Sequence, residues 1–277
     1  MNLTLTERYL AGYHDTNPGA TSRAFAALPV TNATVSFAST YEALIGALPA
    51  DDAPQTVLDL ACGDGHLLGL LAGSTRPHTL IGVDLSAGEL AAARTRLGAR
   101  ATLLQGKAQQ LPLTTASVDA VVSHLALMLM DDAETVITEL HRVLRPGGTL
   151  VGVVGARPSP NPALEAFVRL YPAASQRAEF SGIRFGDRRF RSQGGITELL
   201  AAGFDSLHFE TLTLARDCTP EELWDWFSDT YDTDLLTPAA LADFRRNYLL
   251  ALQPLCGSLG TMKHEDRYQL FSAKARA

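Results

Sequence analysis

The chain of 277 residues has an acidic composition that excludes several classes of protein. It contains 23 lysine and arginine residues against 30 aspartate and glutamate residues, a formal net charge of −7. A nucleic-acid-binding surface needs a basic stripe, and the chain has none of useful size, so we expect no nucleic-acid partner. The three cysteines, Cys62, Cys218 and Cys256, are scattered and form no C-x-x-C pair, which predicts neither a disulfide framework nor a metal site.

The sequence predicts a globular protein without a membrane segment. The first residues lack the apolar core of a signal peptide, and no apolar run approaches the length of a membrane span. The hydrophobic share of 46% is ample for a buried core. We therefore expect a soluble, cytoplasmic monomer or homodimer.

The pattern of elements divides the chain into a front cap, a core and a rear part. Residues 1–53 show helical periodicity in three short segments and predict an N-terminal helical cap. Strands and helices alternate over residues 54–155, as a parallel α/β core requires. Residues 156–277 predict the remainder of the core, with strands at 205–215 and 267–273, together with helices that form a substrate lid.

The run from Val57 to Leu68, V-L-D-L-A-C-G-D-G-H-L-L, is the most informative segment. A short buried strand leads through a turn with two glycines into an apolar helix. Glycines at such a turn let a ligand approach the backbone, because no Cβ intervenes. Asp64 between the glycines would repel a pyrophosphate, whereas it suits a ligand that carries positive charges. The turn therefore predicts a nucleotide-type ligand with cationic groups.

Four further segments complete the predicted core. Residues 79–86 form a second strand that ends in Asp84, roughly 20 residues after the turn, the spacing expected for an acid that binds ribose hydroxyls. The alternative role of Asp84 is to cap the helix that begins at Ala87. Residues 102–106 and 117–124 predict the third and fourth strands. A helix at 133–144, a turn at 145–148 and a fifth strand at 149–154 follow.

In this order, the five segments resemble class I S-adenosylmethionine-dependent methyltransferases, in the branch that includes quinone-biosynthesis and natural-product enzymes. V-L-D-L-A-C-G-D-G resembles the family's first motif, and L-R-P-G-G-T-L at 144–150 is typical of the same family. The resemblance implies a Rossmann-like α/β fold with a doubly wound, mostly parallel, seven-stranded sheet, an N-terminal helical cap and a helical insert before the last strand.

The same resemblance implies the function. S-adenosylmethionine would be the cofactor, and its methyl group would pass to an oxygen or nitrogen of a small molecule, a secondary metabolite. Two alternatives stay open at this point. One is a nicotinamide-dependent oxidoreductase built on the same glycine turn, and the other is a protein that binds S-adenosylmethionine without methyl transfer.

The resemblance also implies which residues bind the cofactor. They are Asp59, Ala61, Gly63, Gly65, Asp84, Leu85, Ala108, Gln109 and Ser123, with Tyr13 and Arg23 from the front cap. One position departs from the family, because Lys107 stands where an aspartate is usual, and a lysine cannot accept a hydrogen bond from adenine. We expect the Ala108 backbone and the Gln109 side chain to make that contact, while Lys107 points into solvent.

Candidate catalytic residues follow from the chemistry of methyl transfer. The reaction needs mainly positioning, with a base where the acceptor must lose a proton. His124, at the end of the fourth strand, is the first candidate base, with packing as its alternative role, and His14 is the second. Trp224, Phe227 and Tyr231 are candidate walls of a substrate pocket, although their helical spacing fits an inward-packing face equally well.

Overall fold

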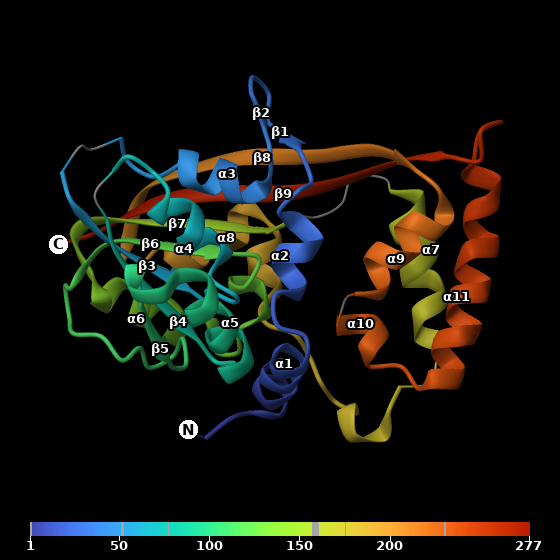
Figure 1. Ribbon diagram of the computed structural model, residues 1–277, viewed down its shortest axis with the longest axis horizontal. Coiled ribbons are helices and arrows are strands. Elements are labelled where there is room, and N and C mark those ends of the chain that lie inside the picture. Colours follow the sequence, from blue (N-terminus) through green and yellow to red (C-terminus); the bar gives the residue numbers. More distant parts are fainter. Residues whose placement is uncertain (1, 51–52, 77, 157–160, 175, 230) are drawn as a thin grey trace. The chain divides into compact units, whose positions relative to one another are not determined.

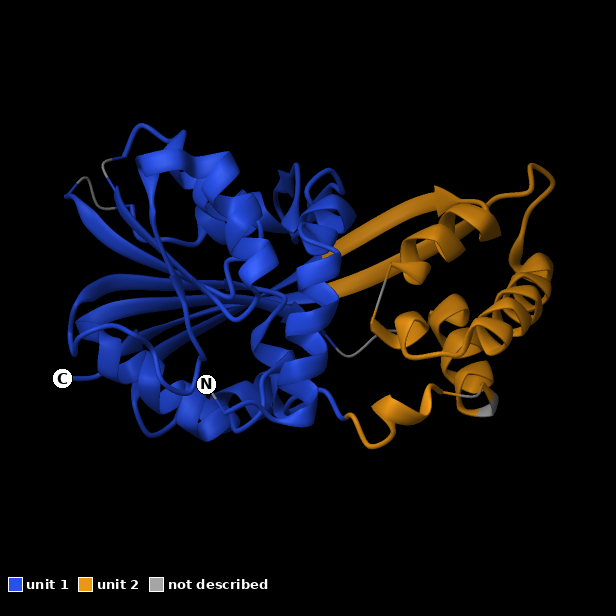
Figure 2. Ribbon diagram, turned by 60° about the horizontal axis from the view of Figure 1, so that its bottom comes forward, with its two compact units in different colours: residues 1–157, 184–212, 268–277 blue, residues 158–183, 213–267 orange. Residues whose placement is uncertain are grey.

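The computed structural model describes residues 2–50, 53–76, 78–156, 161–174, 176–229 and 231–277 (Figure 1). The chain forms two compact units. Unit 1 comprises residues 1–157, 184–212 and 268–277, and unit 2 comprises residues 158–183 and 213–267 (Figure 2). All five strands of the predicted core lie in unit 1.

Within the described residues the strands form one nine-stranded sheet of order β2-β1-β8-β9-β7-β6-β3-β4-β5. The strands are β1 (Val30–Thr31), β2 (Ser36–Phe37), β3 (Gln55–Leu60), β4 (His78–Asp84), β5 (Thr102–Gln105), β6 (Val118–His124), β7 (Leu144–Gly155), β8 (Phe204–Cys218) and β9 (Met262–Ala275). Neighbouring strands from β7 to β5 pair in parallel, whereas β7 pairs with β9 and β1 with β2 antiparallel. The predicted α/β sheet is confirmed. The last strand, β9, is antiparallel to β7 and lies inside the sheet, between β8 and β7.

The predicted number of seven strands is wrong, because the front cap contributes the hairpin of β1 and β2. Asn32 makes the turn between them: its side-chain oxygen accepts hydrogen bonds from the backbone N–H groups of Thr34 (2.9 Å) and Val35 (2.7 Å). Asparagine favours such turns by this local hydrogen bonding. Each strand has only two residues, too few to show an alternating pattern, which is why periodicity did not indicate them.

Helices cover the sheet of unit 1 and build unit 2. Unit 1 contains α1 (Leu5–Thr16), α2 (Ala20–Phe25), α3 (Thr40–Gly46), α4 (His66–Ala72), α5 (Ala87–Leu97), α6 (Ala133–Val143) and α8 (Gln193–Leu200). Unit 2 contains α7 (Pro162–Leu170), α9 (Pro220–Ser228), α10 (Tyr231–Asp234) and α11 (Pro238–Leu252). Short 3₁₀ helices lie at Gly98–Arg100, Leu127–Leu129, Tyr171–Ala173, Ala178–Phe180, Arg188–Arg191 and Gln253–Leu255. No described helix has the length and apolarity required to cross a membrane.

The order of the strands reverses at β3, which has β4 on one side and β6 on the other. Right-handed crossovers that leave in opposite directions place their helices on opposite faces of the sheet. α6 packs on the face of Leu58 in β3, whereas α4 covers Gly82 of β4, where a Cβ would lie 2.8 Å from Leu68. Ligands of open α/β sheets bind at such a reversal, outside the carboxyl ends of the strands.

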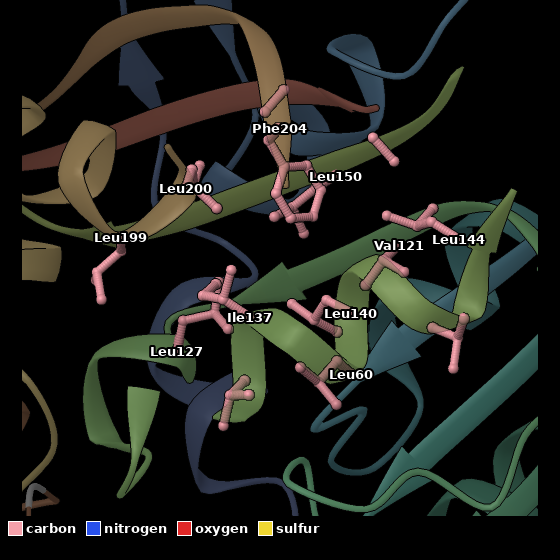
Figure 3. Close-up of a cluster of buried hydrophobic side chains, with 14 of the residues drawn as sticks. Leu60, Val121, Leu127, Ile137, Leu140, Leu144, Leu150, Leu199, Leu200 and Phe204 are labelled. Carbon is pink, nitrogen blue, oxygen red and sulfur yellow. The ribbon is translucent and has the colours of Figure 1, made fainter. Parts of the chain in front are cut away.

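Apolar packing holds α6 and α8 to the sheet (Figure 3). Val121 of β6, Leu140 of α6, Leu150 of β7 and Leu200 of α8 are fully buried in this cluster. α6 ends one residue earlier than predicted, and residues 145–148, predicted as a turn, belong to β7. The positive φ of 76° at Gly147 bends the chain at the start of that strand without ending it.

Candidate functional site

The glycine turn joins β3 to α4 at the reversal of the sheet. Ala61, Gly63 and Gly65 have positive φ angles of 58°, 51° and 74°. A Cβ at Gly65 would lie 2.8 Å from Leu97 of α5, so the turn can pack against that helix only with glycine at this position. The backbone of the turn is therefore held close to α5.

Asp84, at the end of β4, binds this turn through both carboxylate oxygens. Its Oδ2 accepts a hydrogen bond from the Gly63 N–H, and its Oδ1 accepts one from the Ser86 N–H, each at 2.8 Å. A carboxylate has about four lone-pair sites, so each oxygen can accept a further donor. The cap of α5 is Ser86, whose Oγ accepts from the Glu89 N–H at 3.0 Å. The capping role considered for Asp84 thus belongs to its neighbour.

Asp59 is a buried carboxyl near the carboxyl end of β3, a strand that lies between β4 and β6. Its side chain is 2% exposed, and its Oδ2 has no hydrogen-bond partner in the part of the chain that the structure describes. Burial raises its pKa well above the ordinary value, and the negative charges of Asp84 and Asp64 raise it further. A cationic group of a ligand would offset this cost, because a buried charge needs a partner of opposite sign.

Replacing Asp59 by asparagine should therefore stabilise the ligand-free protein at pH 8. Because the pKa of Asp59 is higher in the folded than in the unfolded protein, the free energy of unfolding decreases as pH rises from the unfolded-state pKa to the folded-state pKa, by about 1.4 kcal/mol per pH unit. Asparagine does not titrate, so the variant shows no such decrease. Urea unfolding of both proteins at pH 5 and pH 8 measures the difference. The exposed Asp205→Asn variant is the control, and parallel pH dependences of wild type and Asp59→Asn would contradict the raised pKa.

Asp64, between the two glycines, is already neutralised by the protein. Its Oδ2 lies 2.5 Å from Nη2 of Arg96 on α5 and accepts a hydrogen bond from Ser22 on α2 at 2.8 Å. Nε of Arg96 also donates to the backbone oxygen of Asp64 at 3.0 Å. The cation that balances this carboxylate is thus Arg96, which no pattern in the sequence connects with the turn.

The front cap is fastened to the N-terminal end of α5, beside which α1 lies (Figure 1). Nδ1 of His14 lies 2.7 Å from Oε1 of Glu89, and the Gly19 N–H donates to Oε2 of the same side chain at 2.8 Å. Asp15 accepts from the Ser86 hydroxyl (2.7 Å) and the Gly88 N–H (2.8 Å). The role of Glu89 in holding the front cap was not predicted, because the local pattern S-x-x-E indicates only a capping box.

The expectation that Lys107 points into solvent is wrong. Its Nζ lies 2.7 Å from Oε2 of Glu7 on α1 and donates to the Asn2 carbonyl at 3.1 Å. Glu7 is buried, and a buried carboxylate needs a cationic partner, which Lys107 provides. This ion pair joins the loop after β5 to the front cap. The neighbouring Gln109 side chain donates its amide N–H to the Asp131 carbonyl at 2.6 Å.

His124 lies at the end of β6 with 6% of its surface exposed. Its Nε2 lies 2.8 Å from the Thr40 hydroxyl, and its ring stacks on Tyr41 with centroids 3.6 Å apart. Burial lowers its pKa to about 3, with a smaller contribution from His66. The imidazole is therefore neutral at pH 7. Nδ1 has no partner among the described residues, and the two α3 side chains that hold the ring were missed in the sequence.

The remaining predicted residues lie in both units. Ser123 donates to the Leu60 carbonyl at 3.1 Å and so ties β6 to β3. Tyr13 is half-buried on α1, and the exposed Arg23 of α2 donates to the Pro18 carbonyl at 2.7 Å. Leu85 and Ala108 are half-buried in the segments that follow β4 and β5.

In unit 2, the predicted pocket residues belong to helices that share an aromatic core. Trp224 and Phe227 of α9 are 5% and 9% exposed. They pack with Phe167 of α7 and with Phe244 of α11. The half-buried Tyr231 is the first residue of α10.

Comparison with known proteins agrees with this geometry. Residues 58–152 match a family profile described as a methyltransferase domain. The ubiquinone/menaquinone biosynthesis C-methyltransferase UbiE of Rubrivivax gelatinosus is 31% identical over 185 residues, 62% of this chain and 71% of that protein. The malonyl-(acyl-carrier protein) O-methyltransferase of Methylococcus capsulatus is 38% identical over 99 residues, 35% of this chain and 36% of that protein.

The fold has relatives among solved structures as well. The structure of BH2331 from Bacillus halodurans C-125 superposes with a TM-score of 0.59 and 19% sequence identity. The match covers 86% of this chain and 99% of that one. At this level of identity the superposition establishes a common fold.

Proposed function

Because this chain belongs to the class I S-adenosylmethionine-dependent methyltransferases, we propose that it transfers a methyl group to an oxygen or nitrogen of a small acceptor molecule. S-adenosylmethionine is its cofactor. The observation that carries the proposal is the carboxylate of Asp84, held by the N–H groups of Gly63 and Ser86, together with Asp59, whose Oδ2 has no partner among the described residues. The carboxylate of Asp84 suits two ribose hydroxyls as donors, and the carboxyl of Asp59 suits an ammonium group.

The charges around the turn support this cofactor rather than a pyrophosphate ligand. Asp64 is paired with Arg96 and Glu89 with His14, so the carboxyls of Asp59 and Asp84 remain to meet a ligand. Negative groups at this place repel phosphates and attract an ammonium or sulfonium group. Nothing in the comparisons supports the nicotinamide-dependent alternative.

The protein's share of the reaction is positioning and the exclusion of water. The bound cofactor supplies an electrophilic methyl group on a good leaving group, so correct orientation provides most of the rate. In the proposed roles, Asp84 orients the ribose and Asp59 the ammonium group. The front cap, held by Glu89 and Asp64 through Gly19 and Ser22, keeps water from the crevice. His124, a neutral imidazole, accepts a hydrogen bond from the acceptor.

The aromatic rings around His124 support a planar or apolar acceptor. Tyr41 stacks on the imidazole, Phe25 meets it edge-on with centroids 6.1 Å apart, and His66 lies 4.7 Å from the Tyr41 ring. The names of the relatives describe a C-methyltransferase of ubiquinone and menaquinone biosynthesis and an O-methyltransferase of malonyl-(acyl-carrier protein). The first of these names is consistent with a planar, apolar acceptor. Trp224, Phe227 and Tyr231 keep their proposed role as apolar pocket walls within unit 2.

Label transfer from S-adenosylmethionine tests the proposal. The protein is incubated with methyl-labelled cofactor and with a phenol, a hydroquinone, a carboxylic acid and a primary amine, and NMR of the product locates the new methyl group. We expect transfer to oxygen or nitrogen that is lost in an Asp84→Ala variant. Transfer to carbon alone would contradict the proposed acceptor atom. Cofactor binding without transfer to any acceptor would favour a binding protein.

A further inference from the structure

Unit 2 contains a cavity that the proposed reaction does not use. Its volume is about 760 Å³, within the range of small-molecule sites, roughly 300–1,000 Å³. β8 contributes Arg216 to its lining, β9 contributes Lys263, His264 and Arg267, and α7 begins beside it at Pro162. Four basic or titratable nitrogen groups therefore surround one cavity of ligand size.

Arg216 carries a charge with which no described carboxylate pairs directly. It acts on Glu222 only at a distance, adding to the hydrogen bonds from Thr219 that lower the pKa of that carboxyl. Its guanidinium carbon lies 5.0 Å from the centroid of the Trp226 ring. Its Nε and Nη2 are buried and have no hydrogen-bond partner within the described ranges. A guanidinium stays protonated at every physiological pH, and an aromatic ring compensates only part of its charge. A partly buried guanidinium without a carboxylate partner is costly, and an anion in the cavity would remove that cost.

His264 provides a second unpartnered group in the same lining. It is 2% exposed, and its Nε2 lies 2.6 Å from Oδ2 of Asp266. Asn161 steadies this segment by donating to the Glu265 carbonyl at 2.7 Å and to Oδ1 of Asp266 at 3.3 Å. Nδ1 of His264 has no partner among the residues described. The aspartate thus fixes the ring and leaves one buried nitrogen for another group.

Two acidic residues, Asp217 and Glu265, line the same cavity. Glu265 pairs with Arg267 at 2.8 Å, and Asp266 with His264. Asp217 follows Arg216 directly along β8, so the two side chains leave opposite faces of the strand. Among the cations that line the cavity, Arg267 is paired, whereas Arg216 and Lys263 form no ion pair with a described carboxylate.

We infer that this cavity binds an anionic group of a small molecule, a carboxylate or a phosphate, through Arg216, with His264 and Lys263 beside it. Guanidinium groups bind both kinds of anion by charge-assisted hydrogen bonds. The inference rests on the charge of Arg216, with which no described carboxylate pairs directly, and is independent of the proposed methyl transfer. It adds a second ligand site, within unit 2, to the cofactor site of unit 1.

The two tryptophans of the chain, Trp224 and Trp226, provide the readout. In ¹⁵N-labelled protein each gives one indole N–H signal, and a Trp226→Phe variant assigns them. Inorganic phosphate and, separately, acetate are titrated at constant ionic strength maintained with sodium chloride. We expect a saturable displacement of the Trp226 signal with at least one anion. Saturation by phosphate alone identifies a phosphoryl ligand, by acetate alone a carboxylate, and by both an anion site of either kind.

Variants separate a built site from general anion effects. Arg216→Gln should raise the apparent Kd at least tenfold, about 1.4 kcal/mol. Arg246→Gln, which removes an exposed arginine paired with Asp243 on α11, should leave it unchanged. If Arg216→Gln does not fold, the melting temperatures of the wild type in phosphate, in acetate and in chloride, all at equal ionic strength, replace it. No saturable displacement, equal displacement in Arg216→Gln, or equal melting temperatures would overturn the inference.

Discussion

Replacing Asp84 by alanine should weaken the binding of S-adenosylmethionine by about 100-fold, because two hydrogen bonds to a charged acceptor are worth about 3 kcal/mol together. The carboxylate is held in place by the N–H groups of Gly63 and Ser86, so it meets the ribose hydroxyls without reorganisation. Isothermal titration calorimetry measures the affinity. An affinity within a few-fold of the wild type would show that Asp84 has only a local structural role.

A matched control lies at the other end of the same sheet. Asp119, at the start of β6, accepts a hydrogen bond from the Thr56 N–H at 2.7 Å and pairs with Arg145. Asp119→Ala therefore also removes a carboxylate that accepts a hydrogen bond from a backbone N–H group. This carboxylate lies at the amino ends of the strands, whereas Asp84 lies at their carboxyl ends. We expect lower melting temperatures for both variants and a loss of cofactor affinity for Asp84→Ala alone.

Replacing His124 by glutamine should lower turnover by about 100-fold while cofactor affinity stays within a few-fold. General base catalysis contributes about 10²–10⁴-fold, and a base with a low pKa is at the lower end of this range. The partly buried His141 on α6 packs against Phe204 and offers the matched control, because His141→Gln also exchanges an imidazole for an amide. Equal turnover of the two variants would remove His124 from the catalytic residues and direct attention to His14.

The pH profile gives an independent measure of the same role. Because burial holds the pKa of His124 at about 3, its imidazole stays unprotonated at every pH above about 4. Between pH 8 and pH 5 we therefore expect the rates of the wild type and of the His124→Gln variant to depend on pH in the same way. A rate that falls in the wild type with a midpoint near pH 6.5, and does not fall in the variant, would show that the pKa of His124 in the working enzyme is close to the ordinary value.

Local patterns in the sequence were sufficient for the elements on which the proposed cofactor site is built. The glycine turn, the acid at the end of the second core strand and the cap at Ser86 each depend on residues a few positions apart, so they could be recognised without knowledge of the fold. α11 (Pro238–Leu252) likewise begins at a local signal, because a proline is favoured at the first position of a helix.

The contacts that complete the site join residues far apart in the chain. The Lys107–Glu7 ion pair spans 100 residues, the contact of His124 with Thr40 spans 84, and the ion pair of Asp64 with Arg96 spans 32. Each contact depends on how the front cap and α5 pack on the sheet. The local sequence around one partner does not indicate which residue the other partner is. The sequence by itself thus determined the cofactor turn and the family. Only the tertiary structure decided which charges around the turn are already paired, because pairing requires that distant side chains be brought together.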